Sequence, residues 1–408
     1  MPENQYYNFV SQCKNKQDPE TNLDGVLISH AHRDHFYCIP FLNRNIKIYT
    51  GVVTHKIIKA FYDSTEKRSD NFYYGLKFEK FRTGDILHIK DMEIIPVHVD
   101  HSIPAAYGFI FKTSAGIIVY SGDFRIHGPL LYMTIDLIKK AKEALKEEKA
   151  ERIKALICEG THIHRGAIES EAAVKRQLKS LLKHNPFDVI ILKYDRIDWD
   201  RFRTFSSMAK KFGWKYIIPE KDAYFYYRLN QKAIYDTMRD PNILNDDHIL
   251  ILERGPANYE WKRNIRQLFY KNKKEFRLIK YSQLKTLEGK FFINVSIIQR
   301  DIIQRDIKKF PFINLNCAFI SSSMDPYAEE YFDNTNTLMS KFNELGIPSY
   351  KIHASGHAKP HDIINFVKEL NPEYLIPIHT ENTEFFIHIF KNMDINVISP
   401  IDCPSIDF

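Results

Sequence analysis

The sequence lacks the features that mark several broad classes of protein. Its five cysteines stand far apart and form no Cys-x-x-Cys pair, which argues against a disulfide framework and against a structural zinc ribbon. No apolar run approaches the roughly 20 residues that a membrane-spanning helix needs. Residues 1–20 are polar and show no secretory or transit pattern. These absences predict a cytoplasmic protein in a reducing environment, with no membrane partner.

What the chain does contain is typical of a folded protein with more than one core. It has 408 residues, of which 44% are hydrophobic and 27% are charged. That length exceeds what a single core usually accommodates, so two domains are expected. The formal net charge of +7 permits an anionic substrate such as nucleic acid but does not require one.

Several short apolar runs end in a residue that can bind a metal. Runs of this length, rich in β-branched residues, indicate buried strands, and open α/β sheets usually build their sites at the ends of such strands. The predicted strands are 26–28, 94–97, 117–120, 155–158 and 374–378. Amphipathic helices are predicted around 54–62, 130–150 and 360–370.

The pattern of strands that end in ligands stops near residue 181 and resumes near 348. A strand at 188–192 and a helix at 200–212 open the intervening part. This interruption predicts an inserted domain, with a first domain part at 1–180, the insertion at 181–347, and the return of the first domain at 348–408. On the helix at 200–212, Arg201 is open to two interpretations, an exposed side chain or a contact with a substrate phosphate.

The strongest chemical signal is the segment His30-Ala31-His32-Arg33-Asp34-His35. In extended chain, residues i and i+2 point the same way, so His30 and His32 can bind one ion. A turn then directs Asp34 and His35 toward a second ion. Two Zn²⁺ are expected, with Mn²⁺ as the alternative. With three later residues the set is complete: His30, His32 and His101 for one ion, Asp34, His35 and His379 for the other, and Asp123 as the bridge.

These motifs resemble those of the metallo-β-lactamase fold hydrolases. Two further segments, Cys158-Glu-Gly-Thr161 and His353-Ala-Ser-Gly-His357, are similar to the β-CASP nuclease branch, which includes ribonuclease J-like and polyadenylation-factor-like RNA-processing exonucleases. The resemblance implies an α/β protein, in which an αββα sandwich is interrupted by an inserted α/β β-CASP domain. The family's first strands end in an aspartate well upstream of the histidine cluster. Neither Asp18 nor Asp24 ends an apolar strand, so these strands are expected to be missing.

The resemblance also implies roles for residues outside the ligand set. Glu159 is expected to orient the attacking water or to move its proton, a task it shares with Asp34. His357 is expected to stabilise charge on the scissile phosphate. His353, Ser355 and Gly356 are expected to hold a substrate phosphate, and a purely structural role for His353 is equally compatible.

The predicted function is therefore metal-dependent hydrolysis of RNA by a hydroxide that two zinc ions activate. RNA, in the first instance single-stranded, is the expected partner. Exonuclease or endonuclease action, RNA or DNA, a homodimer and an RNA-processing complex are left open. One alternative is a small-ester or thioester hydrolase of the same fold, which would lack Glu159 and the inserted domain. Another is a catalytically impaired RNA-binding scaffold, which metal content would reveal.

Overall fold

The computed structural model describes residues 23–64, 75–164, 169–230, 243, 245–297, 312, 315–323 and 329–400. The chain forms two compact units. The first comprises Met1–Ile168 and Gly356–Phe408, and the second comprises Glu169–Ser355. Among the described residues, no helix combines the length and the apolar character needed to cross a membrane. Residues 1–22 lie outside the description, and with them the expectation about the upstream strands.

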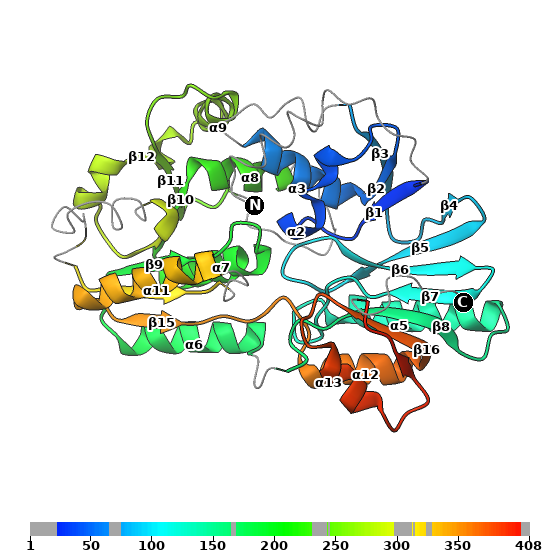
Figure 1. Cartoon of the computed structure of the whole chain (residues 1–408). Coiled ribbons are helices and arrows are strands. Elements are labelled where there is room, and N and C mark those ends of the chain that lie inside the picture. The colour runs from blue at the N-terminus through cyan, green and yellow to red at the C-terminus, as the bar shows by residue number, and fades with distance from the viewer. Residues whose placement is uncertain are drawn as a thin grey trace. The chain divides into compact units, whose positions relative to one another are not determined.

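The first unit is built on a seven-stranded sheet (Figure 1). Its strand order is β17-β16-β8-β7-β6-β5-β4. β4 to β7 are antiparallel neighbours, whereas β7, β8, β16 and β17 run parallel. The bounds are β4 Leu87–Ile89, β5 Met92–Val99, β6 Ala106–Thr113, β7 Gly116–Tyr120, β8 Ile153–Glu159, β16 Pro372–Ile378 and β17 Asn396–Val397.

Two amphipathic helices cover this sheet. α5 (Leu131–Glu147) packs on β5, β6 and β7, and α12 (Pro360–Leu370) packs on α5 and β8. Leu137, Val367 and Leu156 are fully buried in the shared core. α12 begins with a proline in its first turn and ends at Asn371 in the left-handed conformation, as a helix bounded by Pro and Asn should. α13 (Thr383–Phe390) follows and contacts β17.

A smaller sheet completes the first unit. Three parallel strands, β1 (Gly25–Ile28), β2 (Lys47–Gly51) and β3 (Lys77–Phe81), form it, and α3 (Val52–Asp63) packs on β2 and β3. The ring of Phe81 packs on Tyr107 and Phe109 of β6, with centroids 4.9 and 5.7 Å apart. Two sheets packed face to face and covered by helices make the αββα sandwich that the sequence predicted. α2 (Arg33–Phe36) and the 3₁₀ turn η1 (Ile39–Phe41) connect β1 to β2.

The second unit is a parallel α/β domain. Its seven strands have the order β12-β11-β10-β13-β9-β14-β15 and are parallel throughout. They are β9 Val189–Lys193, β10 Lys215–Pro219, β11 Ile249–Glu253, β12 Leu278–Lys280, β13 Phe291–Asn294, β14 Cys317–Ser321 and β15 Ser349–Lys351. The central strands are continuous apolar runs, because helices shield parallel sheets from water on both faces.

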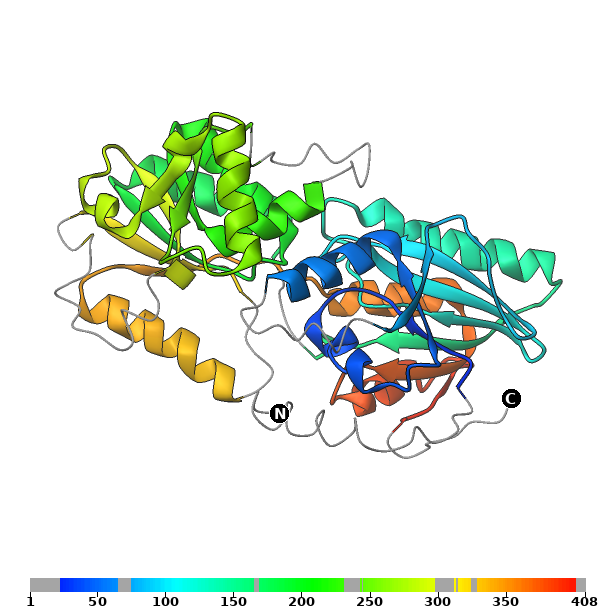
Figure 2. The same ribbon diagram turned by 90° about the horizontal axis from the view of Figure 1, so that it is seen from above.

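Helices surround this parallel sheet (Figure 2). α7 packs on β10 and β13, α8 on β10 and β11, and α11 on β14 and β15. The helices are α6 Glu171–His184, α7 Trp199–Phe212, α8 Glu220–Asn230, α9 Glu260–Lys271 and α11 Glu329–Glu344. Short 3₁₀ turns occupy η2 Glu275–Arg277, η3 Tyr281–Thr286 and η4 Val295–Ile297.

The division between the units differs in position from the predicted boundaries at 180/181 and 347/348. It falls at 168/169 and 355/356, so all of α6 belongs to the second unit. The physical reason is a buried ion pair near the start of α6, where Glu171 meets Arg201 of α7 at 2.6 Å. Arg201 is therefore fully buried, and the interpretation that it is exposed was wrong.

Candidate metal centre

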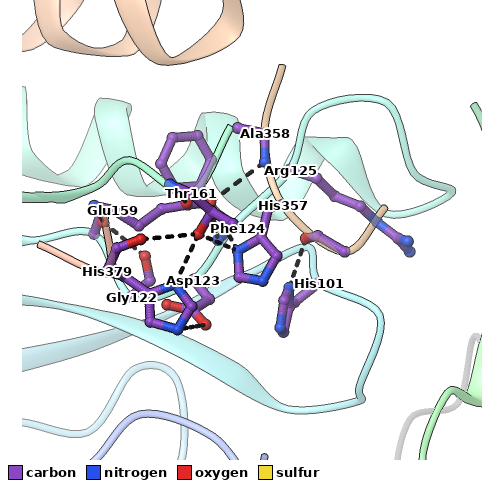
Figure 3. Close-up of polar contacts among 12 residues, drawn as sticks. His101, Gly122, Asp123, Phe124, Arg125, Glu159, Thr161, His357, Ala358 and His379 are labelled. Atoms are coloured by element: carbon purple, nitrogen blue, oxygen red, sulfur yellow. Dashed lines mark hydrogen bonds and ion pairs between the residues drawn. The ribbon is translucent and has the colours of Figure 1, made fainter. Parts of the chain in front are cut away.

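The residues of the predicted ligand set come from the ends of strands in the first unit. Figure 3 shows three of them, His101, Asp123 and His379. His30 and His32 follow β1 in extended chain, and the single turn of α2 carries Asp34 and His35. His101 follows β5, Asp123 follows β7, Glu159 ends β8 and His379 follows β16. His379 has φ of 54°, a left-handed conformation that non-glycine residues adopt at a cost, typically at sites that need a special side-chain direction.

Three imidazoles converge in the first cluster. Nδ1 of His32 lies 2.9 Å from Nε2 of His30 and 2.9 Å from Nε2 of His101. The other nitrogen of His101, Nδ1, donates to the carbonyl of Gly356 at 2.6 Å. A carbonyl only accepts, so this bond leaves the lone pair of His101 on Nε2, facing the other two rings. Burial lowers the pKa of His30 and of His101 well below the usual value, which keeps both rings neutral as metal ligands must be.

A second cluster adjoins the first. Oδ2 of Asp34 lies 3.2 Å from Nε2 of His35 and 3.2 Å from Nε2 of His379. Oδ2 of Asp123 lies 3.2 Å from His35 and 3.8 Å from His379, and it also faces His30 of the first cluster at 3.5 Å. A single carboxylate oxygen is thus shared by both groups of imidazoles, which is the position predicted for Asp123.

The charge of this second cluster fits a cation. Burial alone would lower the pKa of His35, but its bonds to Asp123 and Asp34 raise that pKa to about 10. The pKa of His379 is likewise raised, mainly by Asp34, against the effect of burial. Protons on these two rings balance the charge of the two carboxylates, and a bound cation could take their place. Among the described residues, Oδ1 of Asp123 is buried and has no hydrogen-bond partner, so the group retains an unused ligand atom.

Glu159 and His357 form a buried pair beside the ligands (Figure 3). Oε1 of Glu159 lies 3.3 Å from Nδ1 of His357. The same carboxylate accepts from the backbone amides of Phe124, Thr161 and Ala358, at 3.4, 3.1 and 3.3 Å. Burial raises its pKa, but His357 and His379 together outweigh this effect, and the net pKa lies below the usual value. Glu159 is therefore an ionised carboxylate fixed in place by the chain around it.

Thr161 joins the two histidines of this region and was assigned no role from the sequence. Its Oγ1 lies 2.7 Å from Nδ1 of His379 and 3.1 Å from Nδ1 of His357. The hydroxyl donates to the carbonyl of His379 and accepts from both rings. The only signal for Thr161 in the sequence was its place in the Cys158-Glu-Gly-Thr161 motif.

A buried ion pair supports the loop that carries His101. Nε and one terminal nitrogen of Arg125 donate to Oδ1 of Asp100 at 3.2 Å each. Both side chains are buried, and Asp100 also accepts from the backbone of Leu130 at 3.1 Å. The ion pair thus ties the loop after β5 to the loop after β7.

The three residues predicted to hold a phosphate lie on both sides of the boundary between the units at 355/356. His353 and Ser355 belong to the second unit and Gly356 to the first. His353 is largely buried, which lowers its pKa to about 3, and its Nδ1 contacts the carbonyl of Ser322 at 3.1 Å. At Gly356, a Cβ would lie 2.6 Å from Oγ of Ser102, so only glycine fits beside His101. Their role toward phosphate stays a prediction.

Comparisons with known families agree with this architecture. Residues 4–177 match the beta-lactamase superfamily domain, and residues 349–400 match the Zn-dependent metallo-hydrolase RNA specificity domain. A crystal structure of a protein of unknown function from Enterococcus faecalis V583 superposes with a TM-score of 0.67, at 19% identity, over 94% of this chain and 81% of that one. That likeness shows the fold.

Curated relatives extend the match to most of the chain. Ribonuclease J of Sinorhizobium meliloti is 21% identical over 90% of this chain and 59% of its own length. Ribonuclease J of Mycoplasma pneumoniae is 23% identical over 89% of this chain and 58% of its own length. Ribonuclease J2 of Bacillus subtilis is 26% identical, with coverage of 88% and 59%. The chain thus spans less than three fifths of these relatives, and it belongs to the metallo-β-lactamase fold hydrolases, in the β-CASP branch that includes ribonuclease J.

Proposed function

We propose that this protein is a metal-dependent phosphodiesterase that cleaves RNA. The observation that carries the proposal is the shared Oδ2 of Asp123, which faces both groups of imidazoles beside the buried Glu159–His357 pair. A site with two such groups suits two divalent cations, and zinc is the metal that the imidazole and carboxylate donors favour. The RNA specificity domain matched at 349–400 and the ribonuclease J relatives supply the substrate class.

The ligand residues divide into two sets that share one member. One cation would be held by His30, His32, His101 and Asp123, and the other by Asp34, His35, His379 and the same Asp123. Two cations bound there would supply the positive charge that stabilises the phosphoryl oxygens during in-line displacement.

The chain's own residues supply the remaining functions. The side chain of Asp34 is 62% accessible, although neighbouring groups partly desolvate its carboxylate. That desolvation raises its pKa, but the hydrogen bonds to His35 and His379 outweigh it, and the net pKa lies below the usual range. Its carboxylate therefore stays ionised. The lowered pKa makes it a weak base, so we assign it the role of accepting a hydrogen bond from the attacking water and of receiving the proton as the bond to phosphorus forms. Glu159 is fully buried and bonded to three amides, so it acts by orienting His357. Nδ1 of His357 contacts Thr161 and Glu159, and Nε2 is the atom that acts on the phosphate.

The loop before α12 completes the proposed site. The carbonyl of Gly356 is bonded to His101, and we include the hydroxyl of Ser355 and the backbone amide of Gly356 in the proposal as donors to a substrate phosphate. His353 is included in the proposal as a further phosphate contact.

End-labelled single-stranded RNA tests the proposal directly. Zinc-loaded or manganese-loaded protein is incubated with RNA that carries a 5′-monophosphate or a 5′-triphosphate, and the products are separated on a sequencing gel. Cleavage is expected with either metal and none after chelation. Asp34→Ala should abolish it, while Asp91→Ala, an exposed aspartate of the same unit outside the ligand set, should retain it.

Three results would count against the proposal. Cleavage at the wild-type rate by purified Asp34→Ala would refute the role of the second cluster. Hydrolysis of a small ester or thioester but not of RNA would favour that alternative class. RNA binding without bound metal and without cleavage would identify a scaffold.

A further inference from the structure

Arg201 is a fully buried arginine of α7 whose guanidinium has several partners. Its two terminal nitrogens donate to the two carboxylate oxygens of Glu171, at 2.8 and 2.6 Å. One of them also donates to the backbone carbonyl of Ala354 at 3.1 Å. Nε lies 3.7 Å from Asp198, the residue that caps α7. Two parallel N–H···O bonds of this kind are the strongest geometry available to an arginine–carboxylate pair.

Two partners of Arg201, Glu171 and Ala354, lie close to the points where the chain crosses from one unit to the other. The chain passes from the first unit to the second at 168/169 and returns at 355/356. Glu171 lies just after the first of these crossings, at 168/169. Ala354 lies just before the second crossing, at 355/356, with only Ser355 in between. One side chain therefore bonds to both connecting segments, on the second unit's side of each. The interpretation of Arg201 as a phosphate contact does not fit a guanidinium that is 0% exposed.

The segment after Ala354 leads straight into the metal centre. Two residues on, the carbonyl of Gly356 fixes Nδ1 of His101 at 2.6 Å. His357 follows, and the amide of Ala358 then donates to Glu159 at 3.3 Å. On the other side, the amide of Ile352 donates to the carbonyl of Ser321 at 3.0 Å. The loop 352–358 is thus held at both ends, and Arg201 provides its anchor in the middle.

We propose that Arg201 is a positioning residue, which fastens the two connecting segments to each other and so sets the placement of His357 and of the Gly356 carbonyl. The inference rests on the proposed function for its kinetic consequence but not for its structural one. Lysine cannot replace arginine here, because a single ammonium cannot span both oxygens of Glu171 and also reach the Ala354 carbonyl. A displacement of about 1 Å of a group that acts on the substrate can lower the rate about 100-fold. A loosened loop should therefore slow RNA cleavage more than it weakens RNA binding.

The chain offers a matched control for the test. Arg277 is also a fully buried arginine of the second unit, and it donates to the backbone carbonyls of Ile249, at 2.8 Å, and of Ile243. Ile249 and Ile243 both lie outside the two connecting segments. Arg277→Lys should therefore lower the thermal stability of the protein about as much as Arg201→Lys, without acting on the loop 352–358.

The experiment compares wild type, Arg201→Lys, Arg277→Lys and Glu171→Gln in the full chain. Hydrogen exchange of peptides that cover 352–358 is measured by mass spectrometry, zinc affinity by competition with a chelating dye, and RNA cleavage as kcat and KM. For Arg201→Lys we expect the rate of amide hydrogen exchange in this loop and the dissociation constant for zinc each to rise about tenfold. We expect kcat for RNA cleavage to fall about tenfold, with KM within about twofold of wild type. Glu171→Gln, which keeps one oxygen acceptor, should give a smaller change in the same direction.

Each outcome decides the matter. Equal exchange and equal zinc affinity in Arg201→Lys and Arg277→Lys would overturn the proposal, because Arg201 would then support only the stability of the second unit. If Arg201→Lys fails to fold, Glu171→Gln carries the same comparison. If the wild type does not cleave RNA, the proposed function fails, yet loop exchange and zinc affinity still test the positioning role.

Discussion

Replacing Thr161 by valine should weaken one metal site and spare the other. Valine keeps the shape of threonine but removes the hydroxyl, which lies 2.7 Å from Nδ1 of His379 and 3.1 Å from Nδ1 of His357. Without that acceptor, the proton of His379 is no longer held on Nδ1, and the ring is no longer fixed in the orientation in which Nε2 can act as a metal ligand. The site of His30, His32 and His101 keeps its own support, the bond from His101 to the carbonyl of Gly356.

The magnitude follows from the kind of contact that is lost. Removing the hydrogen-bond partner of a metal-binding histidine typically costs about 10–100-fold in affinity. This corresponds to about 1.4–2.7 kcal/mol of binding free energy. Because Thr161 is 5% exposed, water cannot readily take the place of the hydroxyl, so the upper half of that range is expected.

A zinc titration in competition with a chelating dye distinguishes the two sites when they differ in their affinity for zinc. Wild type should bind two zinc ions, and Thr161→Val should bind the first as wild type does and the second about 30–100-fold more weakly. Thr161→Ser keeps the hydroxyl and serves as the control. Equal affinities for the second ion in the valine and serine variants would refute the assignment of Thr161 as the support of His379.

Three further predictions concern charge. Zinc affinity should rise with pH between about 6 and 8, because His35, with a pKa raised to about 10, must lose a proton to bind, and calorimetry in buffers of different ionisation enthalpy should count at least one released proton. Arg125→Met removes the cation that is paired with the buried Asp100, and should lower the free energy of unfolding by about 3–5 kcal/mol in urea titrations. Burial raises the pKa of Asp222 to about 6. The folded protein therefore keeps this carboxyl protonated where the unfolded chain has lost the proton, and the free energy of unfolding falls as the pH rises from about 4 through 6. Relative to wild type, the free energy of unfolding of Asp222→Asn should therefore increase by up to about 3 kcal/mol between pH 4 and pH 7.

The parts of the site that could be predicted depend on local chain geometry. His30 and His32 share a direction because they are two residues apart in extended chain, and strands that end in a ligand bring those ligands to one edge of a sheet. The same local rules predicted α12 from Pro360 and Asn371. Such features depend on residues that are close together in the chain, so they can be predicted from the sequence without knowledge of the fold.

The parts that could not be predicted depend on contacts between distant segments. Thr161 and His379 are bonded across 218 positions, and Arg201 and Ala354 across 153. Strand order in the second unit is also a long-range property: β13 lies between β9 and β10, although both of those strands precede it in the chain. An amphipathic helix with Arg201 near its start is compatible with an exposed side chain until the partner carboxylate of Glu171 is placed.

Hydrogen bonding separates the acids that position from the acids that bind. Asp100 and Glu159 are both buried, and each is surrounded by donors: Arg125 and the amide of Leu130 for one, three backbone amides for the other. A carboxylate bonded in this way has little capacity left for a metal. Asp123 is equally buried, yet its Oδ1 has no hydrogen-bond partner among the described residues and its Oδ2 faces only imidazoles that carry or share protons. A protein tolerates such an unsatisfied acid when another group supplies the missing charge, and among these three buried acids that reasoning favours Asp123 over Glu159 and Asp100 as the one that would hold a cation.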